Sequence, residues 1–326
     1  MRGPRIRIGI VGYGNLGRGV LAACRQTPDL TPAAIFTRRD PKTIEASIPV
    51  QSVHQLPEWQ KRLDVLILCG GSATDLPRQT PELAASFNVV DSFDTHARIP
   101  THFRKVDQTA RKAGTLALLC SGWDPGLFSL MRVLGEAVLP KGETHTFWGP
   151  GVSQGHSDAI RRIPGVRHAV QYTIPLPAAL RAVRSGKGQG LTSAQKHRRL
   201  CFVALEPDAD RKAVEHAIKT MPHYFAEYET TVRFVSESVL RTRHAGMPHG
   251  GQVIRFGVTG EGTPQRLEFH LQLGSNPEFT AGVLAASARA VYRLHRSGHV
   301  GALTLLDIPI GLLSPHAPDR LRRQYL

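Results

Sequence analysis

Three features of the 326-residue sequence predict an α/β protein with a parallel sheet and a second, α+β domain. An apolar run at residues 6–11 ends in a glycine-rich turn that opens a helix. Apolar runs at residues 65–69 and 115–120 alternate with helical patterns, and the pattern changes after Leu139. Strands that alternate with helices form parallel sheets, whereas the later alternating runs are typical of antiparallel ones. The chain is also longer than one usual domain, so we expect two.

The first predicted strand leads into Gly12-Tyr13-Gly14-Asn15-Leu16-Gly17. This spacing of glycines is weak evidence by itself, but here it joins a strand to a helix, which is the context that a dinucleotide site requires. Gly12 permits the sharp turn, Gly14 lets the backbone approach a pyrophosphate, and Gly17 lets the helix lie close to the strand. The sequence therefore predicts a Rossmann-type dinucleotide-binding domain with the pyrophosphate at the helix N-terminus.

The next strand, around residues 33–36, ends in Thr37-Arg38-Arg39 and lacks the acidic residue that binds the ribose 2′-hydroxyl of NAD. Guanidinium groups and a hydroxyl bind a 2′-phosphate, and one guanidinium can stack on the adenine. The alternative is a pair of solvated arginines in a surface loop. We predict NADP as the cofactor.

Small residues follow the strand at 65–69, at the sheet edge where open α/β sheets bind their ligands. Thr80 and Pro81 are expected to open the next helix, and residues 88–91 to form the strand after it. The predicted cofactor site consists of Gly12, Tyr13, Gly14, Asn15, Leu16, Gly17, Thr37, Arg38, Arg39, Cys69, Gly70, Gly71, Ser72, Ala73, Thr74, Asp91 and Ser92.

Acidic residues follow two of the predicted strand ends. Asp94 comes shortly after the strand at 88–91, and Asp124 after the strand at 115–120, with a helix at 98–112 between them. Because the carboxyl ends of parallel strands share one edge of a sheet, both carboxylates are expected beside the nicotinamide. Turn and capping chemistry explains the same residues equally well, since Asp-Pro-Gly is a strong turn signal.

The residues after Leu139 predict the α+β domain. Strands are expected at 203–205, 231–235, 253–258 and 267–273, with a helix at 210–220 and a long helix at about 278–296. We predict one antiparallel sheet, covered by helices on one face and free for substrate or a partner subunit on the other. The predicted domains are residues 1–120, which the segment at 301–326 rejoins, and the substrate-binding and dimerisation domain at 121–300.

A stretch rich in glycine and polar residues, residues 145–165, surrounds Trp148. Such a loop can fold backbone donors over a polar ligand, although a purely structural loop fits its composition as well. His156 and Asp158 suggest a catalytic dyad, but no nucleophile accompanies them. We therefore expect them to organise the loop, with Asp158 near a substrate amine.

Composition limits the classes of function. The net charge of +15 is spread along the chain without an aromatic-interleaved RNA motif, so we expect an anionic cofactor and substrate and no nucleic-acid partner. No apolar run is long enough to cross a membrane, and no signal peptide is expected at residues 1–5. Four scattered cysteines without a C-x-x-C pair predict reduced thiols of a cytoplasmic protein, without a metal site.

Several longer blocks of the sequence resemble the meso-diaminopimelate dehydrogenase family, nearly from end to end. The glycine turn at 11–18 and the segments at 36–39 and 71–75 are the less specific blocks. Five blocks are far more specific: Gly122-Trp123-Asp124-Pro125-Gly126, residues 145–165, Ala169-Val170-Gln171-Tyr172-Thr173, Gly246-Met247-Pro248-His249-Gly250-Gly251 and Asn276-Pro277-Glu278-Phe279-Thr280.

The resemblance implies NADP-dependent oxidative deamination at the D-configured end of meso-2,6-diaminopimelate, which gives L-2-amino-6-oxopimelate, ammonia and NADPH in lysine and cell-wall precursor metabolism. By residue-by-residue match, Asp94 and Asp124 face the reacting amino group as catalytic residues, with Trp123 nearby. The match also implies that Trp148 shapes the pocket, that Gln154 and Gly155 bind the reacting carboxylate, and that Thr173, Arg199, His249 and Asn276 bind the distal, L-configured end. A homodimer is implied as well.

Hydride can leave the α-carbon only when the amine is neutral, so we expect Asp94, Asp124 or a water that one of them orients to take the proton. Two alternatives to this function stay open from the sequence. One is another NADP-dependent amino-acid-pathway reductase of the same fold, of the dihydrodipicolinate reductase or homoserine dehydrogenase type. The other is a non-catalytic NADP-sensing regulator.

Overall fold

A computed structural model describes residues 5–326, which divide into two compact units. Unit 1 comprises residues up to Leu130 together with Pro277–Leu326, and unit 2 comprises Met131–Asn276. Each unit is described by itself. Residues 1–4, on which the expected absence of a signal peptide partly depends, lie outside the described residues.

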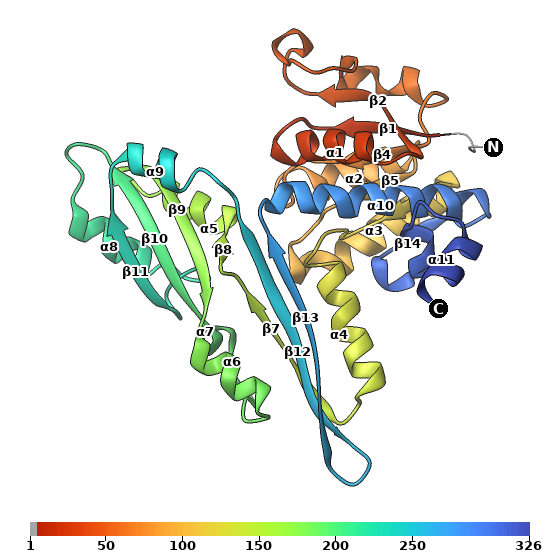
Figure 1. Ribbon diagram of the computed structural model, residues 1–326. Coiled ribbons are helices and arrows are strands. Elements are labelled where there is room, and N and C mark those ends of the chain that lie inside the picture. Colours follow the sequence, from red (N-terminus) through yellow and green to blue (C-terminus); the bar gives the residue numbers. More distant parts are fainter. Residues whose placement is uncertain (1–4) are drawn as a thin grey trace. The chain divides into compact units, whose positions relative to one another are not determined.

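Unit 1 contains a parallel sheet with the strand order β14-β6-β5-β4-β1-β2-β3 (Figure 1). Every neighbouring pair runs parallel. Read from the other end, the first six strands have the order β3-β2-β1-β4-β5-β6, which is that of a doubly wound dinucleotide-binding sheet. This order confirms the predicted fold class. The strands are β1 (Ile6–Val11), β2 (Leu30–Thr37), β3 (Val50–Ser52), β4 (Val65–Leu68), β5 (Val89–Asp91), β6 (Leu116–Leu118) and β14 (Gly301–Leu303).

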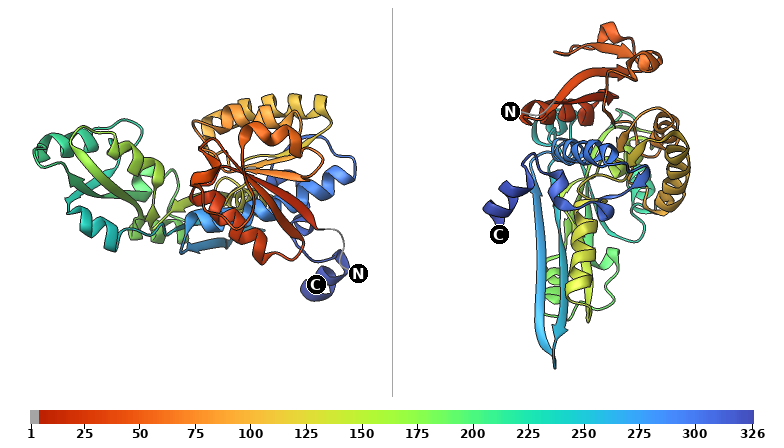
Figure 2. Two further views of the ribbon diagram at one scale, coloured as in Figure 1. Left: turned by 90° about the horizontal axis from the view of Figure 1, so that it is seen from above. Right: turned by 90° about the vertical axis from the view of Figure 1, so that its right-hand side faces the viewer.

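Helices cover both faces of this sheet (Figure 2). On one face α1 and α10 form a core cluster with Ile8, Ile10 and Ile67 of the strands, and on the other α2 and α3 form a second cluster with Leu66 and Leu68. The helices of unit 1 are α1 (Asn15–Gln26), α2 (Leu76–Ala84), α3 (Ile99–Ala113), α10 (Asn276–Arg296) and α11 (Pro318–Tyr325). Short 3-10 helices lie at Pro41–Thr43, Val53–Trp59, His96–Arg98, Leu305–Asp307 and Ile310–Leu313.

The expected opening of α2 at Thr80 is wrong. The helix begins at Leu76 with Pro77 in its first turn, so Pro81 lies inside it. Thr80 is fully buried, and its hydroxyl donates a hydrogen bond to the carboxylate of Asp91 instead of capping a helix.

Unit 2 contains two sheets, where we had predicted one antiparallel sheet. One has the order β11-β10-β9-β8 and the other β13-β12-β7. β11 pairs parallel with β10, and the remaining pairs are antiparallel. The strands are β7 (Gly142–Trp148), β8 (Gly151–Val152), β9 (Val166–Pro175), β10 (His197–Leu205), β11 (Glu229–Phe234), β12 (His249–Thr259) and β13 (Thr263–Leu273).

Helices pack on both sheets of unit 2. Residues of α5 and α8 form a core cluster with one face of β9 and β10, α9 packs on the opposite face, and α6 packs on β7 and β12. The helices are α5 (Gln154–Arg161), α6 (Pro177–Arg184), α7 (Ser193–Lys196), α8 (Arg211–Lys219) and α9 (Glu237–Arg243), and α4 (Leu127–Val138) spans the first unit boundary. The stretch at 145–165, which we expected to be a loop, therefore contains parts of β7, all of β8 and α5.

The unit boundaries differ from the predicted domain boundaries at 120 and 300. Residues 277–300 belong to unit 1, because the apolar face of α10 packs on the sheet of that unit through Ala281, Leu284 and Ala288. The alternation of the nearby strands had led us to assign this helix to the second domain.

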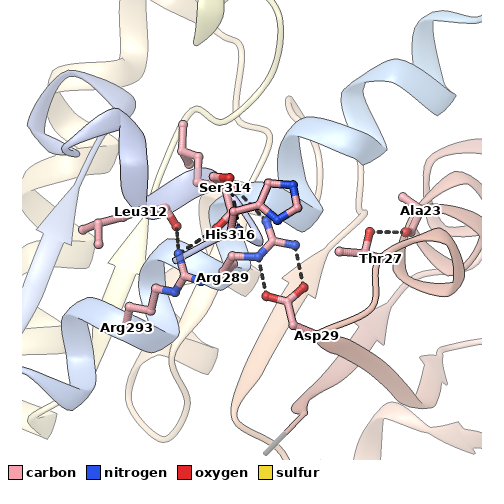
Figure 3. Close-up of polar contacts among 9 residues, drawn as sticks. Ala23, Thr27, Asp29, Arg289, Arg293, Leu312, Ser314 and His316 are labelled. Atoms are coloured by element: carbon pink, nitrogen blue, oxygen red, sulfur yellow. Dashed lines mark hydrogen bonds and ion pairs between the residues drawn. The ribbon is translucent and has the colours of Figure 1, made fainter. Parts of the chain in front are cut away.

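A buried arginine ties the C-terminal segment of unit 1 to α10 and to the turn before β2 (Figure 3). Arg289 is 2% exposed, donates to both carboxylate oxygens of Asp29 and donates to the carbonyl of Leu313 at 2.6 Å. Arg293, one helical turn later, donates to the carbonyls of Leu312 and Ser314. Asp29 precedes β2, so this network lies at the amino ends of the strands, opposite the edge where ligands are expected.

Removal of one member of a fully buried ion pair costs about 3–5 kcal/mol. Arg289 is buried but the side chain of Asp29 is 27% exposed, so water can partly solvate the carboxylate that remains. We therefore expect Arg289→Met to lower the free energy of unfolding of unit 1 by about 2 kcal/mol, measured by urea unfolding. The matched control is Arg322→Met, which breaks an ion pair with Asp319 whose side chains are 64% and 80% exposed, and which should change stability little. Equal effects of the two substitutions would contradict this account.

Candidate active site

The glycine turn after β1 leaves open space at the N-terminus of α1. Gly12 has a φ of +93°, and a Cβ on Gly17 would lie 2.1 Å from the carbonyl oxygen of Gly12, so both positions require glycine. Gly14 is exposed, and a Cβ built there meets no atom within 4 Å. A helix N-terminus with free space above it suits an anionic group such as a pyrophosphate.

Two exposed arginines follow β2 and are held by neighbouring turns. Arg39 donates to the carbonyl of Tyr13 at 2.9 Å, and Arg38 forms an ion pair with Asp75 at 2.9 Å. Asp75 also accepts a 2.9 Å hydrogen bond from the backbone N–H of Gly71. The role of Asp75 was not predicted, although its position directly after the predicted turn at 70–74 was a signal.

A cavity of about 530 Å³ adjoins this pair, and its lining includes Arg38, His54, Thr74, Asp75 and Arg78. Arg38 and Arg78 on this cavity pair with Asp75 and Glu82 of the same lining. Two arginines directly after β2, with no acidic residue among residues 37–39, fit a phosphorylated ribose better than a ribose with free hydroxyls. The residues present therefore fit the predicted NADP.

The side chain of Asp91 is not available to the cofactor, so its predicted cofactor contact stays a prediction, and only the backbone of this residue could make that contact. Its side chain is fully buried at the end of β5, and its carboxylate is occupied by protein groups. Ser92, the next residue of the predicted set, is half-buried.

Asp94 lies on the segment after β5 and is exposed. Its backbone N–H donates to the hydroxyl of Ser72 at 2.8 Å, which joins this segment to the turn after β4. The pKa of the Cys120 thiol is raised by burial and further by the carboxylates of Asp91 and Asp94. One oxygen of Asp91 accepts from the backbone N–H groups of Phe93 and Cys120, so the segment of Asp94 lies beside the start of the segment that carries Asp124.

Trp123 and Asp124 lie between β6 and α4. Trp123 is 7% exposed and packs edge-on against Phe128, with ring centroids 5.2 Å apart, and Asp124 is half-buried. Unit 1 thus collects Asp94, Trp123 and Asp124 at the same sheet edge as the glycine turn, which is an arrangement that can bind a cationic amine beside a dinucleotide.

In unit 2 a buried guanidinium lies between β9, β10 and the segment before β11. Arg199 is paired with Thr173 across the two strands and donates to its hydroxyl, and its guanidinium carbon is 3.9 Å from the ring centroid of Tyr228. Burial lowers the pKa of Arg199. Within residues 5–326 no carboxylate forms an ion pair with it, and its Nε has no hydrogen-bond partner. Such a site can bind an anion from outside the chain.

The segment at 247–249 brings further predicted residues to this part of unit 2. Met247 accepts a hydrogen bond from the backbone of Asn276 at 2.9 Å, and its sulfur is 2.7 Å from the amide nitrogen of Gln154. His249 is 9% exposed, and burial lowers its pKa. The structure therefore links Gln154, His249 and Asn276 through one short segment.

His156 and Asp158 do not form a dyad. Nδ1 of His156 is 2.7 Å from the hydroxyl of Ser153, whereas exposed Asp158 pairs with Arg161 on the same helix. Burial, with smaller contributions from the charges of Arg199 and His249, lowers the pKa of His156 to about 4. Gly155, on the first turn of α5, is exposed.

Trp148 is held in place by a buried histidine. The backbone N–H of Trp148 donates to Nε2 of His197 at 2.8 Å, and the Nδ1 of His197 is 2.9 Å from the carbonyl of Ser193. Nε2 accepts and Nδ1 donates, so this imidazole is neutral. Burial lowers the pKa of His197 to about 4. Sequence reasoning missed His197, because the run at 196–199 looks like a solvated basic surface until the alternation of β10 places residues 197 and 199 inside.

Other kinds of site are absent from the part of the chain that the structure describes. No group of three or more His, Cys, Asp or Glu residues could hold a metal ion there. The four cysteines are unpaired, and none of the helices in residues 5–326 is long and apolar enough to cross a membrane.

Comparisons with known proteins show what this chain is similar to. Residues 122–275 match a family model described as the diaminopimelic acid dehydrogenase C-terminal domain. A meso-diaminopimelate D-dehydrogenase of Ureibacillus thermosphaericus is 59% identical over 324 residues, which cover 99% of each chain.

Solved structures agree with these matches. A variant of the Clostridium tetani E88 enzyme, solved with DAP, is 52% identical with a TM-score of 0.95 and covers 99% of this chain and 100% of its own. Its substitutions are Q154L, T173I, R199M, P248S, H249N and N276S. An engineered D-amino acid dehydrogenase bound to NADP⁺ is 44% identical with a TM-score of 0.89, and the match covers 99% of this chain and 100% of that one.

The neutral state of His197 predicts a pH dependence of stability. Its pKa is about 4 in the folded chain against an ordinary value near 6.5, so the unfolded chain binds a proton that the folded chain does not between these values. The contribution of neutral His197 to the free energy of unfolding is therefore intact above pH 6.5 and is lost as the pH falls. The loss between pH 7 and pH 5 is about 2 kcal/mol.

We therefore expect the stability of His197→Gln, measured by urea unfolding, to fall less than that of the wild-type chain between pH 7 and pH 5. His216→Gln is the matched control because His216 is exposed on α8 of the same unit. An unchanged pH dependence in His197→Gln would show that His197 does not titrate in this way.

Proposed function

The chain belongs to the meso-diaminopimelate D-dehydrogenase family, and on this premise we propose how its own residues carry out the reaction. The reaction is oxidative deamination at the D-configured centre of meso-2,6-diaminopimelate, with release of ammonia and L-2-amino-6-oxopimelate. NADP, when bound, accepts the hydride from the substrate carbon. Full-length membership of this family sets aside the other reductases of the same fold and the non-catalytic regulator.

NADP is held by the turns at the carboxyl ends of β1, β2 and β4. Gly12, Gly14 and Gly17 let the pyrophosphate approach the N-terminus of α1, and Thr37, Arg38 and Arg39 bind the 2′-phosphate. The exposure of both arginines and the adjoining cavity support this assignment. Asp75 orients Arg38 through their ion pair, so that its guanidinium is already in place before the phosphate arrives.

The distal, L-configured end of the substrate binds to Arg199, Thr173, His249 and Asn276. The distal carboxylate supplies the negative charge that Arg199 lacks within the chain, and the Tyr228 ring fixes the plane of the guanidinium. The attraction between a buried cation and an anion is stronger than that between an exposed cation and an anion, because water screens the buried pair less. This subsite selects a substrate that carries a second carboxylate.

The reacting, D-configured end lies with Asp94 and Asp124, whose carboxylates attract the ammonium group. One of them, or a water that it orients, takes the proton that leaves the amine neutral, and a second water then adds to the imine carbon and displaces ammonia. In unit 1 Trp123 provides an apolar surface beside Asp124. In unit 2 the family resemblance assigns Trp148 to the shape of the substrate pocket, and Gln154 and Gly155 to donation to the reacting carboxylate. Asp158, which already pairs with Arg161, is placed to attract a substrate amine only if that pair opens.

The observation that carries this assignment is that this chain and the C. tetani enzyme have the same residue at the same residue number at six positions. The C. tetani variant solved with DAP was changed at six residues, and this chain has the unchanged residue at every one of those numbers: Gln154, Thr173, Arg199, Pro248, His249 and Asn276. Five of the six, all but Pro248, are residues that the family resemblance assigns to the substrate.

We also propose that the chain forms a homodimer in the cytoplasm. The unit 2 part of α4 exposes Val133, Leu134 and Val138 to 49%, 47% and 57%, which is an apolar face that a second copy would cover. Four unpaired cysteines suit a reducing compartment.

The function is tested by the reduction of NADP, followed at the absorbance band of reduced nicotinamide, with meso-diaminopimelate against its LL and DD isomers. We expect turnover with the meso isomer and little with the LL isomer, which has no D-configured centre. Equal rates with the LL isomer, or no turnover with any isomer, would overturn the proposal.

Asp94→Asn should lower kcat at least about 100-fold, because the amide cannot take a proton, while the dissociation constant of NADP stays within about threefold. Steady-state kinetics and fluorescence titration of NADPH measure the two effects. Asp319→Asn, an exposed aspartate of α11 in the same unit, serves as the matched control. A near-normal kcat would remove Asp94 from the catalytic machinery.

Arg199→Met should raise the KM for meso-diaminopimelate about 10- to 100-fold, because the variant loses one or two charge-assisted hydrogen bonds to the substrate. The effect on kcat should be smaller. Arg198→Met is the matched control, since Arg198 is the neighbouring residue and is exposed on the other face of β10. A KM that changes equally in the two variants would contradict the proposed distal subsite.

A further inference from the structure

The carboxylate of Asp91 joins four separate parts of unit 1. Its Oδ1 accepts hydrogen bonds from the backbone N–H groups of Phe93 at 3.2 Å and Cys120 at 2.9 Å. Its Oδ2 accepts from the hydroxyl of Thr80 at 2.9 Å and is 2.7 Å from Nε2 of His102. Asp91 is fully buried, so every contact of this carboxylate is with the protein.

One oxygen of this carboxylate binds both segments that carry the proposed catalytic aspartates. Phe93 directly precedes Asp94, and Cys120 begins the segment that leads to Asp124. The backbone carbonyl of Asp91 also accepts a hydrogen bond from the N–H of Ser121 at 2.9 Å. The two segments are thus fixed to a single point at the end of β5.

The backbone at Cys120 needs this support. Its φ of 56° lies in the left-handed region, which residues with a side chain adopt at a cost of about 1–3 kcal/mol unless the surroundings enforce it. The hydrogen bonds from Cys120 and Ser121 to Asp91 hold the chain in this conformation, which sets the direction in which it leaves β6 toward Trp123.

The remaining partners keep the carboxylate from rotating. Thr80 comes from α2 and His102 from α3, and both are buried. The His102 ring also stacks on Phe93, with centroids 4.1 Å apart and planes 19° apart. His102 therefore contacts both the carboxylate and the residue before Asp94.

We propose that Asp91 is a positioning residue that fixes Asp94 and Asp124 relative to each other for deamination, with His102 orienting its carboxylate. This inference rests on the proposed function, in which those two aspartates bind and deprotonate the substrate amine. Reacting groups that move by about 1 Å lose roughly 100-fold in rate, so a buried group that fixes two of them controls kcat without touching the substrate.

The test compares Asp91→Ala with Asp91→Asn in the full-length chain. Alanine removes the bridging oxygen, and we expect kcat with meso-diaminopimelate and NADP to fall about 100-fold while KM and the dissociation constant of NADPH stay within about threefold. Asparagine keeps an oxygen that accepts from Phe93 and Cys120, and Thr80 and the other tautomer of His102 can accept from its amide, so kcat should return to within about fivefold of wild type.

Two further measurements separate positioning from loss of stability. Arg289→Met lowers the stability of the same unit at the opposite edge of the sheet and should leave kcat unchanged. Hydrogen exchange of the amides of Phe93 and Cys120 should accelerate in Asp91→Ala but not in Asp91→Asn. If Asp91→Ala does not fold, His102→Ala replaces it, with an expected tenfold loss of kcat that His102→Gln, which keeps a donor, partly restores.

The outcomes distinguish this inference from the proposed function. A wild-type chain without turnover of meso-diaminopimelate overturns the proposed function and this inference with it. An active wild type in which Asp91→Ala, or His102→Ala in its place, retains kcat within threefold overturns the inference alone. A loss of kcat that Asp91→Asn does not restore also overturns it, because the bridging oxygen is then not the cause.

Discussion

The buried guanidinium of Arg199 is the interaction on which the substrate assignment depends. It is packed against the ring of Tyr228 and the hydroxyl of Thr173, and no carboxylate of the described chain neutralises it. An uncompensated buried charge is costly, and an anionic ligand offsets that cost when it binds. In the proposed function the distal carboxylate of a diamino dicarboxylic acid supplies this anion, whereas an amino acid with one carboxylate has no second acid group to place there.

In unit 1 the positions of the candidate site residues depend on one edge of the sheet. This edge is formed by the carboxyl ends of β1, β2, β4, β5 and β6. The glycine turn, the two arginines and the two acidic segments follow these strand ends in turn, and Ser72, Asp75 and Asp91 join one segment to the next. The groups that we propose to bind the cofactor and the amine are therefore joined by one network of hydrogen bonds and ion pairs. A change in Asp91 would alter the place of Asp94 without altering its chemistry.

The parallel sheet, the glycine turn and the basic cofactor segment could be predicted from the sequence, because the spacing of apolar residues, the spacing of glycines and the charge are local signals. Asp94, Asp124 and Arg199 were selected mainly by resemblance, since turn and surface chemistry explained them equally well. Tyr228, His197 and the bridging role of Asp91 depend on contacts between distant strands and helices, which no local pattern encodes. The assignment of α10 failed for the same reason: its apolar face fits either unit, and only packing on β1 decides.

A crystal structure of this chain with NADP and meso-diaminopimelate tests the central claim most directly. The account predicts that the distal carboxylate forms an ion pair with the Arg199 guanidinium while the amine of the D-configured centre contacts Asp94 or Asp124. A substrate bound with its distal carboxylate away from Arg199, or with its D-configured amine away from both aspartates, would contradict it.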